Sequence, residues 1–499
     1  MGKFQFGRNA WLRTLTDEQI TTIHKHALNI LEESGVCFHS EQALRILEEA
    51  GAIVDYASKT ARLGEKMVID AINMTPESFF LHNRFNEPVA EIGGNHVHFD
   101  PGSATIRFLE ADGKTIRPTL GSDLIKIAQV TEAMKNISLC STALTPSDIP
   151  EILGDCFRVY ILLKNSTKPF IGGAFSADGV KLIHEFLSIG AGGSEQLKKR
   201  PRMVLDVCPT APLQWSGIAC ANILDASRLG IPIEFISVPM IGASAPATLA
   251  GCVVLHTVET LSGITLAQTV SPGIPIVYGG APMYFDMRYL TTSLNSIETN
   301  LIGTSYAQMA KYYGIPTHTY AALSDAKAVD AQAGLETAMS GVIALLSGIN
   351  IISGPGVMDF CNTFSLEKLV IDNEICGMAK RYAKGILFTN ETLAVDLIKE
   401  INHTGDYINT AHTRAWFKKE PYLPSKIIDR KMYGMWSDDG SKNTFELAKE
   451  VVADILETKP VKKLDPEIEK ALDEIWERAL GAAFDSKECC LRQQGARSQ

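Results

Sequence analysis

Aromatic side chains gather in one short stretch, Tyr278–Tyr289, which also carries an arginine. A quaternary ammonium ion has no N–H group to donate, and ring faces attract it by cation–π interaction worth about 0.5–2 kcal/mol per ring. An aromatic cup with few formal charges would therefore suit such a cation. For each ring the alternative is a structural role at the end of a strand. The rings that we predict for a cation cage are Tyr278, Tyr284, Phe285, Tyr320 and Phe360.

The elements that would position these rings follow a regular pattern. Short β-branched apolar runs alternate with helical stretches, and the runs start about 30–40 residues apart, the period of a strand–loop–helix unit in a parallel sheet. Seven such units, with an eighth nearby, predict an α/β fold, a (β/α)8 TIM barrel, whose chemistry lies in the loops after the strands. The runs are Leu139–Leu144, Pro169–Phe175, Met203–Pro209, Pro232–Met240, Ile274–Pro282, Pro316–Ala322 and Asn350–Val357.

The sequence on either side of the predicted barrel indicates further elements that would pack on it. Residues 1–121 would form helices, opened by the capping pattern Thr16-Asp17-Glu18-Gln19, and β-hairpins with turns at Gly93-Gly94 and Asp112-Gly113. The barrel core would occupy residues 122–380. A C-terminal helical region would cover 381–484, and the polar stretch 485–499 would be a disordered tail.

Composition and charge narrow the classes of partner. The chain of 499 residues has a net charge of −10 and no basic block, which argues against nucleic acid or an anionic membrane as a partner. Leu249–Val270 is long and apolar, but His256 and Glu259 interrupt it, so we expect a buried helix and not a membrane span. Cysteines within apolar stretches and the lack of a secretory segment after Met1 predict a reducing cytoplasm.

Other motifs give weaker signals. No glycine-rich nucleotide motif follows a strand, and His96 and His98 lack a third metal ligand at a suitable spacing, so we expect no metal and no tightly bound cofactor. Lys327 near a strand end could form a Schiff base, although a solvated ion pair with a neighbouring acid is the simpler interpretation. Asp206 interrupts an apolar strand, where we expect a structural hydrogen-bond role.

Three segments resemble the trimethylamine methyltransferase family. They are Phe99–Gly102, Ser324–Lys327 running into Asp330–Gly334, and Ser353–Gly356, and the resemblance extends over nearly the whole chain. Members of that family are similar barrels that transfer a methyl group from a methylamine to the cobalt of a separate corrinoid protein. The resemblance therefore implies a corrinoid-dependent methyltransferase with a corrinoid protein as partner, and a homo-oligomer is expected.

The chain departs from the founding members of that family at one position. They carry pyrrolysine, which is thought to engage a tertiary amine, whereas this chain has only the twenty standard residues. The corresponding position would lie in or near Ser324–Gly334, so Ser324, Asp325 and Gln332 mark the expected catalytic region. The departure makes the branch without pyrrolysine the closer match, which implies a quaternary amine such as glycine betaine, proline betaine, carnitine or γ-butyrobetaine.

The chemistry of a quaternary amine agrees with this expectation. Its nitrogen leaves as a neutral tertiary amine when Co(I) takes the methyl group, so no general acid is obligatory and catalysis can rest on orientation. Three alternatives remain open: a Schiff-base aldolase-type barrel using Lys327, a betaine-binding protein without activity, and a zinc-dependent thiol methyltransferase, for which the chain lacks an evident Cys/His ligand set.

A betaine also has a carboxylate, which an aromatic cup would leave without donors. Arg288 follows the aromatic stretch and offers a bidentate fork, with a surface ion pair as its alternative. His318 is a second candidate, although it lies on a predicted strand and could instead be a core histidine. The backbone N–H groups of Gly354 and Gly356 are a third candidate, because they would serve an anion without any side chain.

Overall fold

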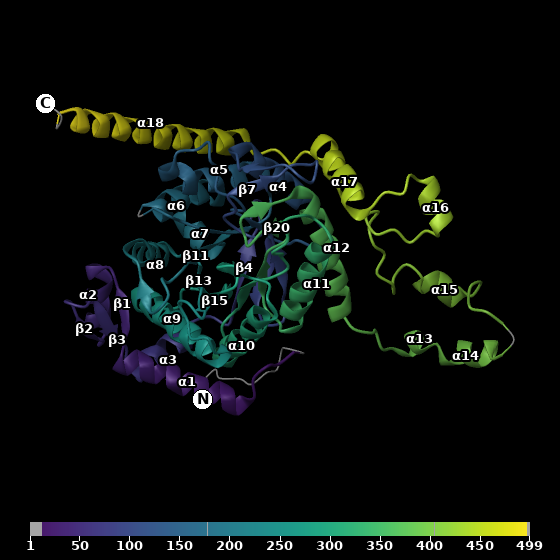
Figure 1. The fold of residues 1–499 in the computed structure, drawn as a ribbon, viewed down its shortest axis with the longest axis horizontal. Coiled ribbons are helices and arrows are strands. Elements are labelled where there is room, and N and C mark those ends of the chain that lie inside the picture. Colours follow the sequence, from purple (N-terminus) through teal and green to yellow (C-terminus); the bar gives the residue numbers. More distant parts are fainter. Residues whose placement is uncertain (1–11, 177, 404, 497–499) are drawn as a thin grey trace.

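Eight parallel strands form a closed barrel in the computed structural model, which describes residues 12–176, 178–403 and 405–496 (Figure 1). One run of the sheet joins five strands and another joins three. A parallel bridge from Tyr278 to Thr317 and hydrogen bonds from Ser138 and Leu139 to Phe99 O connect the two runs. The predicted (β/α)8 fold is confirmed. Its strands are β6 (His98–Asp100), β9 (Cys140–Ser141), β10 (Phe170–Gly173), β11 (Met203–Val207), β13 (Ile233–Ser237), β15 (Ile276–Gly280), β18 (His318–Tyr320) and β19 (Ile351–Ser353).

A helix follows each barrel strand and covers its outer face (Figure 1). The apolar stretch predicted to be a buried helix is α9. It is long and apolar enough to cross a membrane, but 72% of its most apolar window is buried inside the protein, which is typical of a core helix. The helices are α4 (Gly121–Ala133), α5 (Gly154–Asn165), α6 (Gly179–Ala191) with α7 (Ser194–Lys199), α8 (Gly217–Leu229), α9 (Leu249–Val270), α10 (Ile297–Tyr313), α11 (Ala331–Leu346) and α12 (Leu366–Ala383).

The eighth strand lies earlier in the chain than the expected barrel start at residue 122. It is β6, which pairs in parallel with β19 in the register His98 to Ile351. The three-residue strand sits between two hairpins, and their period-two pattern hides it in the sequence. The predicted turn at Asp112-Gly113 is confirmed, since β7 (Arg107–Leu109) pairs antiparallel with β8 (Ile116–Pro118). Gly93-Gly94 is instead the exit from a hairpin, which leads into β6.

That other hairpin closes the floor of the barrel. It consists of β4 (Ser78–His82) and β5 (Pro88–Gly93), whose turn falls between these strands. Its inner residues form an apolar cluster with residues from the early parts of the barrel strands, separate from the main core. With this end filled, a ligand can enter only from the opposite end, where the strands terminate. The cluster contains Leu81, Ala90, Ile92, Leu139, Ile171, Val204, Val277 and Ile351.

An N-terminal layer packs against α9. Its first helix, α1, opens with the predicted capping box, in which Thr16 accepts from Gln19 N and the Gln19 side chain reaches back to Thr16 N. The layer contains α1 (Asp17–Glu33), β1 (Val36–Phe38), α2 (Glu41–Glu49), β2 (Ile53–Asp55), β3 (Thr60–Arg62) and α3 (Glu65–Met74), and its sheet is completed by β12 (Gln214–Trp215) from the barrel.

After α12 the chain leaves the barrel and later returns. Residues 384–442, which we call the arm, project from the body with short helices and then lead into α17, which packs on α12 and α4 (Figure 1). The tail predicted to be disordered from residue 485 continues the helix α18 through Ala496, and residues 497–499 lie outside the described residues. The helices are α13 (Asn390–Leu393), α14 (Val395–Ile401), α15 (Ala411–Trp416), α16 (Tyr433–Asp438), α17 (Thr444–Thr458) and α18 (Pro466–Ala496).

Short strands and turns lie at the open end of the barrel. They include a hairpin after β15, formed by β16 and β17, and a second one after β19, formed by β20 and β21. These loops surround the ends of the barrel strands, where the candidate residues were expected. The remaining elements are η1 (Glu151–Leu153), β14 (Met240–Ile241), β16 (Met283–Asp286), β17 (Thr291–Ser293), β20 (Val357–Met358) and β21 (Thr363–Phe364).

Candidate active site

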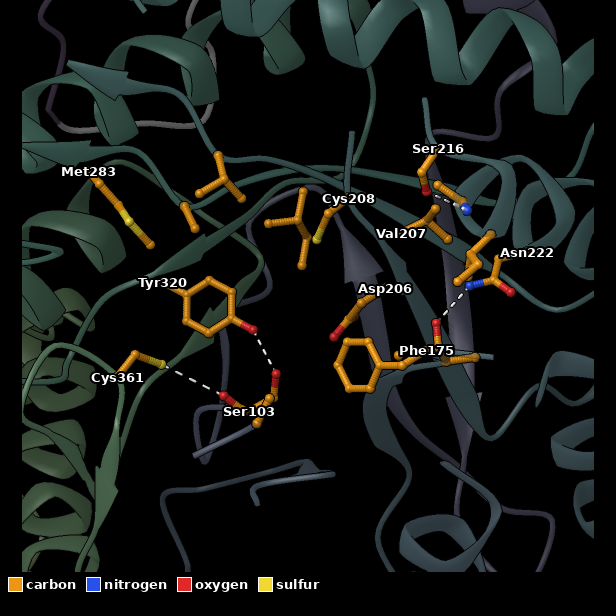
Figure 2. A pocket seen from close by; sticks show the side chains of 18 of the residues that line it. Ser103, Phe175, Asp206, Val207, Cys208, Ser216, Asn222, Met283, Tyr320 and Cys361 are labelled. Carbon is orange, nitrogen blue, oxygen red and sulfur yellow. Dashed lines mark hydrogen bonds between the residues drawn. The ribbon is translucent and has the colours of Figure 1, made fainter. Parts of the chain in front are cut away.

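A cavity of about 430 Å³ opens at the carboxyl ends of the barrel strands. Residues at or after the ends of β6, β10, β11, β13, β15, β18 and β19 line it, so seven of the eight barrel strands contribute to one site. Figure 2 shows Asp206, Phe175 and Tyr320 around the same space, with the apolar side chains Met283 and Val207 on its rim. A mostly apolar cavity with a few converging polar groups is the usual form of a small-molecule site.

Asp206 is the polar group that stands out in this cavity. It projects from β11, and its side chain accepts no hydrogen bond from the described part of the chain, with Oδ1 buried and unpartnered. Burial and the neighbouring Glu234 raise the pKa of Asp206 well above its ordinary value, while His318 and Arg158 oppose that rise. The predicted structural hydrogen bond is therefore wrong. A buried carboxyl group without a hydrogen-bond partner carries a desolvation cost that nothing in the described chain offsets.

A hydrogen-bonded network lies beneath the cavity. Nδ1 of His318 contacts Oε1 of Glu234, and its Nε2 is 2.9 Å from Oγ of Ser353. Ser353 donates to Oδ2 of Asp100 at 2.7 Å, so its oxygen is left to accept from His318. Burial lowers the pKa of His318 to about 4 and raises the pKa of Glu234 well above its usual range. This network fixes the imidazole ring inside the barrel.

His318 does not reach the cavity as a carboxylate ligand. It is about 0% exposed, and its ring packs edge-on against the ring of Tyr320 with centroids 5.2 Å apart. The alternative of a core histidine agrees with this placement. Gly279 makes room for it, because a Cβ there would lie 2.9 Å from Oε1 of Glu234 and 3.1 Å from Nδ1 of His318.

Tyr320 is the predicted cage ring that the structure places at the cavity. It ends β18 and borders the cavity, and its hydroxyl lies 2.8 Å from Oγ of Ser103 on the loop after β6. Contacts at both ends, to Ser103 and to His318, hold the ring in one orientation. Phe175, which is not among the predicted cage rings, borders the cavity from the loop after β10 and is 60% exposed. Two aromatic rings therefore face the same space as Asp206 (Figure 2).

Tyr278 points to the outside of the barrel. Side chains alternate along a strand, and Val277 belongs to the barrel floor, so Tyr278 faces the helices. There its ring packs against His256 of α9, 5.4 Å away, and against Tyr306 and Tyr313 of α10. It is fully buried in this layer and cannot contribute to a cation cage.

The rest of the aromatic stretch lies on the hairpin after β15. Tyr284 and Phe285 are half-buried on β16, and neither lines the cavity, although their neighbour Met283 does. Arg288 is 76% exposed and binds Asp286 with Nη2 and Oδ2 2.6 Å apart. The surface ion pair that was its alternative agrees with this placement. The structure thus does not bring the predicted aromatic stretch together as one cup.

Phe360 does not line the cavity, and its ring contacts a lysine of the chain. Nζ of Lys327 lies 3.6 Å from the centroid of its ring and donates to Asp325 O at 2.7 Å. Lys327 is exposed and does not line the cavity, so this geometry lends no support to a Schiff-base lysine. Among the described residues it does not pair with a carboxylate, which its alternative interpretation had predicted; its contacts are a carbonyl oxygen and a ring.

The expected catalytic region forms a rigid loop beside the cavity and does not line it. Ser324 donates to Oε2 of Glu336 at 2.6 Å, and Gln332 Nε2 donates to Oε1 of the same carboxylate at 3.0 Å. Asp325 accepts from Ser293, and burial raises its pKa to about 6. These contacts join α11 to the preceding loop.

The backbone N–H groups of Gly354 and Gly356, predicted to bind the substrate carboxylate, already donate to acceptors within the chain. Gly354 N donates to Asp100 O at 3.1 Å, and Gly356 N donates to Oδ2 of Asp372 at 2.7 Å. Gly354 is needed for close packing, because a Cβ there would lie 2.1 Å from Ala321 O. Both N–H groups are thus unavailable to a ligand.

The histidines weighed as metal ligands are on the floor side of the barrel. His96 pairs with Glu91 at 3.2 Å, and His98 Nε2 lies 2.9 Å from Glu91 O. Within residues 12–176, 178–403 and 405–496 there is no cluster of three or more metal-ligating side chains.

The fold and the cavity together define a TIM-barrel enzyme with a small-molecule site at its mouth. A family model for trimethylamine methyltransferase (MTTB) matches residues 5–480, and the chain belongs to this family of methyltransferases. The resemblance seen in the sequence is confirmed, and the protein is an enzyme of the methyltransferase class.

Curated relatives match nearly end to end. Trimethylamine methyltransferase MttB of Desulfitobacterium hafniense (strain DSM 10664 / DCB-2) is 32% identical, covering 93% of this chain and 94% of its own. Glycine betaine methyltransferase of D. hafniense (strain Y51) is 33% identical, covering 92% and 95%. Among solved structures, the monomethylamine methyltransferase MtmB of Methanosarcina barkeri superposes with a TM-score of 0.52 at 13% identity, covering 92% of this chain and 91% of that one, a likeness of fold.

Proposed function

We propose that this enzyme takes a methyl group from a quaternary amine, glycine betaine or a relative such as proline betaine, carnitine or γ-butyrobetaine, and passes it to the Co(I) corrinoid of a partner protein. Support comes from the relative named glycine betaine methyltransferase and from a chain built only of the twenty standard residues. The reducing cytoplasm is the compartment that this chemistry requires, and we assign the enzyme to it.

The observation that carries this proposal is the unpartnered Asp206 facing the rings of Tyr320 and Phe175. A trimethylammonium group offers no N–H donor, so charge and ring faces are what can hold it. Burial raises the pKa of Asp206, and a cation bound beside its carboxyl group would lower that pKa again. Binding of the cation favours the ionised form of Asp206. The free energy needed to ionise this buried group reduces the net affinity, which limits over-tight binding of the substrate.

The transfer itself requires alignment and no proton. The methyl carbon forms a bond with the electron pair of Co(I) as the C–N bond breaks, and the pair of that bond stays on nitrogen. The leaving amine is neutral, so its attraction to Asp206 and the rings falls away. The residues of the cavity have to hold the cation, exclude water and direct one methyl group toward the open mouth.

A methylation assay tests this proposal. Co(I) cobalamin would be mixed with the enzyme and a panel of amines, and conversion to methyl-Co(III) would be followed spectrally. We expect turnover with at least one quaternary amine and at least about tenfold slower turnover with trimethylamine. Equal rates for trimethylamine and every quaternary amine would remove the proposed substrate class, and ligand binding without methylation would identify a binding protein.

A further inference from the structure

Arg158 is a buried cation that borders the cavity. It lies on α5, is 1% exposed, and is the only lysine or arginine among the described residues that line the cavity. Its Nη2 donates to Asp155 Oδ1 at 2.9 Å and to Gly173 O at 3.0 Å, and its Nε donates to Gly154 O at 3.3 Å. Its Nη1 makes no hydrogen bond to any residue that the structure describes. Two N–H groups of a guanidinium are therefore left for a ligand.

The guanidinium is held rigidly. Asp155, its partner, also accepts from the backbone N–H groups of Phe175 and Ser176 at 2.6 and 3.0 Å, which ties α5 to the loop after β10. The ring of Phe175 lies over the guanidinium, 4.9 Å from the centroid to Cζ. A fixed guanidinium edge is a well-ordered receptor for an anion because little side-chain freedom remains to be lost.

We propose that Arg158 binds the carboxylate of the substrate, which makes that substrate a zwitterion with a quaternary nitrogen. This inference rests on the proposed function and names the second pole of the same substrate. The cavity carries both required charges, Arg158 for the anion and Asp206 for the cation, within about 430 Å³. Arg288 and His318 do not border the cavity, and the N–H groups of Gly354 and Gly356 already donate to other acceptors.

The test compares glycine betaine with choline, which has the same trimethylammonium group and a hydroxyl group in place of the carboxylate. Arg158→Lys keeps the charge and the pairing with Asp155 but removes the second N–H edge. We expect wild type to favour betaine by about 10- to 100-fold in kcat/KM, the range of a charge-assisted hydrogen bond. The variant would lose most of this preference while choline turnover changes less than about threefold.

Two results would overturn the inference: no preference for betaine in wild type, or equal losses for both substrates in Arg158→Lys. The exposed Arg288→Lys, in the ion pair after β15, is the matched control and should leave the preference unchanged. Thermal unfolding checks that the variants fold, and an additional Arg158→Met/Asp155→Asn variant removes both charges if the lysine variant is unstable. A total lack of methylation with every quaternary amine would instead remove the proposed function.

Discussion

The mouth of the barrel contains two regions that look equally suited to chemistry in different ways. The hairpin after β15 is rich in aromatic residues, yet its arginine is paired with Asp286 and its rings do not line the cavity. Near the ends of β10 and β11 the residue types are less conspicuous, yet Asp206 has an unpartnered buried oxygen there and Arg158 of α5 borders the same cavity. The contrast teaches that a site is marked by groups without partners more reliably than by a concentration of suitable residue types.

The largest effect is expected from Asp206→Asn. Replacing a carboxylate beside a substrate cation removes a Coulomb attraction of about 4 kcal/mol at 4 Å for an effective dielectric constant of 20, part of which desolvation offsets. We expect kcat/KM for betaine to fall by at least about 30-fold. Asp286→Asn, at the aromatic hairpin, should change it less than about twofold. Similar losses in the two variants, measured by cobalamin methylation, would erase the contrast between the regions.

A smaller effect is expected from Tyr320→Leu. The substitution keeps much of the volume and removes the π-face, a loss of about 1–2 kcal/mol or 5- to 30-fold in affinity for the cation. Tyr284→Leu and Phe285→Leu should bind betaine as wild type does, because their rings lie outside the cavity. Calorimetric titration with betaine checks all three variants. Normal binding by Tyr320→Leu together with weak binding by the hairpin variants would reverse the assignment.

The pH dependence of binding should separate the regions further. Burial raises the pKa of Asp206 in the empty site, and a bound cation favours the ionised form and so lowers that pKa. Betaine affinity should therefore rise with pH, by at most tenfold per unit, until the pH exceeds the pKa of the empty site. Proton release on binding, measured in buffers of different ionisation enthalpy, should disappear in Asp206→Asn. Unchanged release in that variant would assign the proton to another group.

The smallest effect on activity is expected from Tyr278→Leu. Its ring is packed among His256, Tyr306 and Tyr313, so truncation should lower the free energy of unfolding by about 1–3 kcal/mol. Betaine affinity should stay within about twofold of wild type. Urea unfolding combined with titration distinguishes the two roles, and a weakened affinity with intact stability would return Tyr278 to the cage.

The barrel was readable from the sequence because each unit repeats a strong local signal, a β-branched run followed by a helix. The strand β6 was missed because three residues carry almost no periodicity. The site was harder to predict, since whether Tyr278 faces inward depends on strand register and not on residue type. One signal was present and misread: Asp206 interrupts an apolar strand, and such an acid needs either an internal partner or a ligand.

The central claim is that the substrate cation sits between Asp206 and Tyr320. A crystal structure with glycine betaine bound tests it most directly. We predict the quaternary nitrogen within about 6 Å of the Tyr320 ring centroid, next to the Asp206 carboxylate. Density for betaine against Tyr284 and Phe285 on the hairpin after β15, with an empty space beside Asp206, would contradict the account.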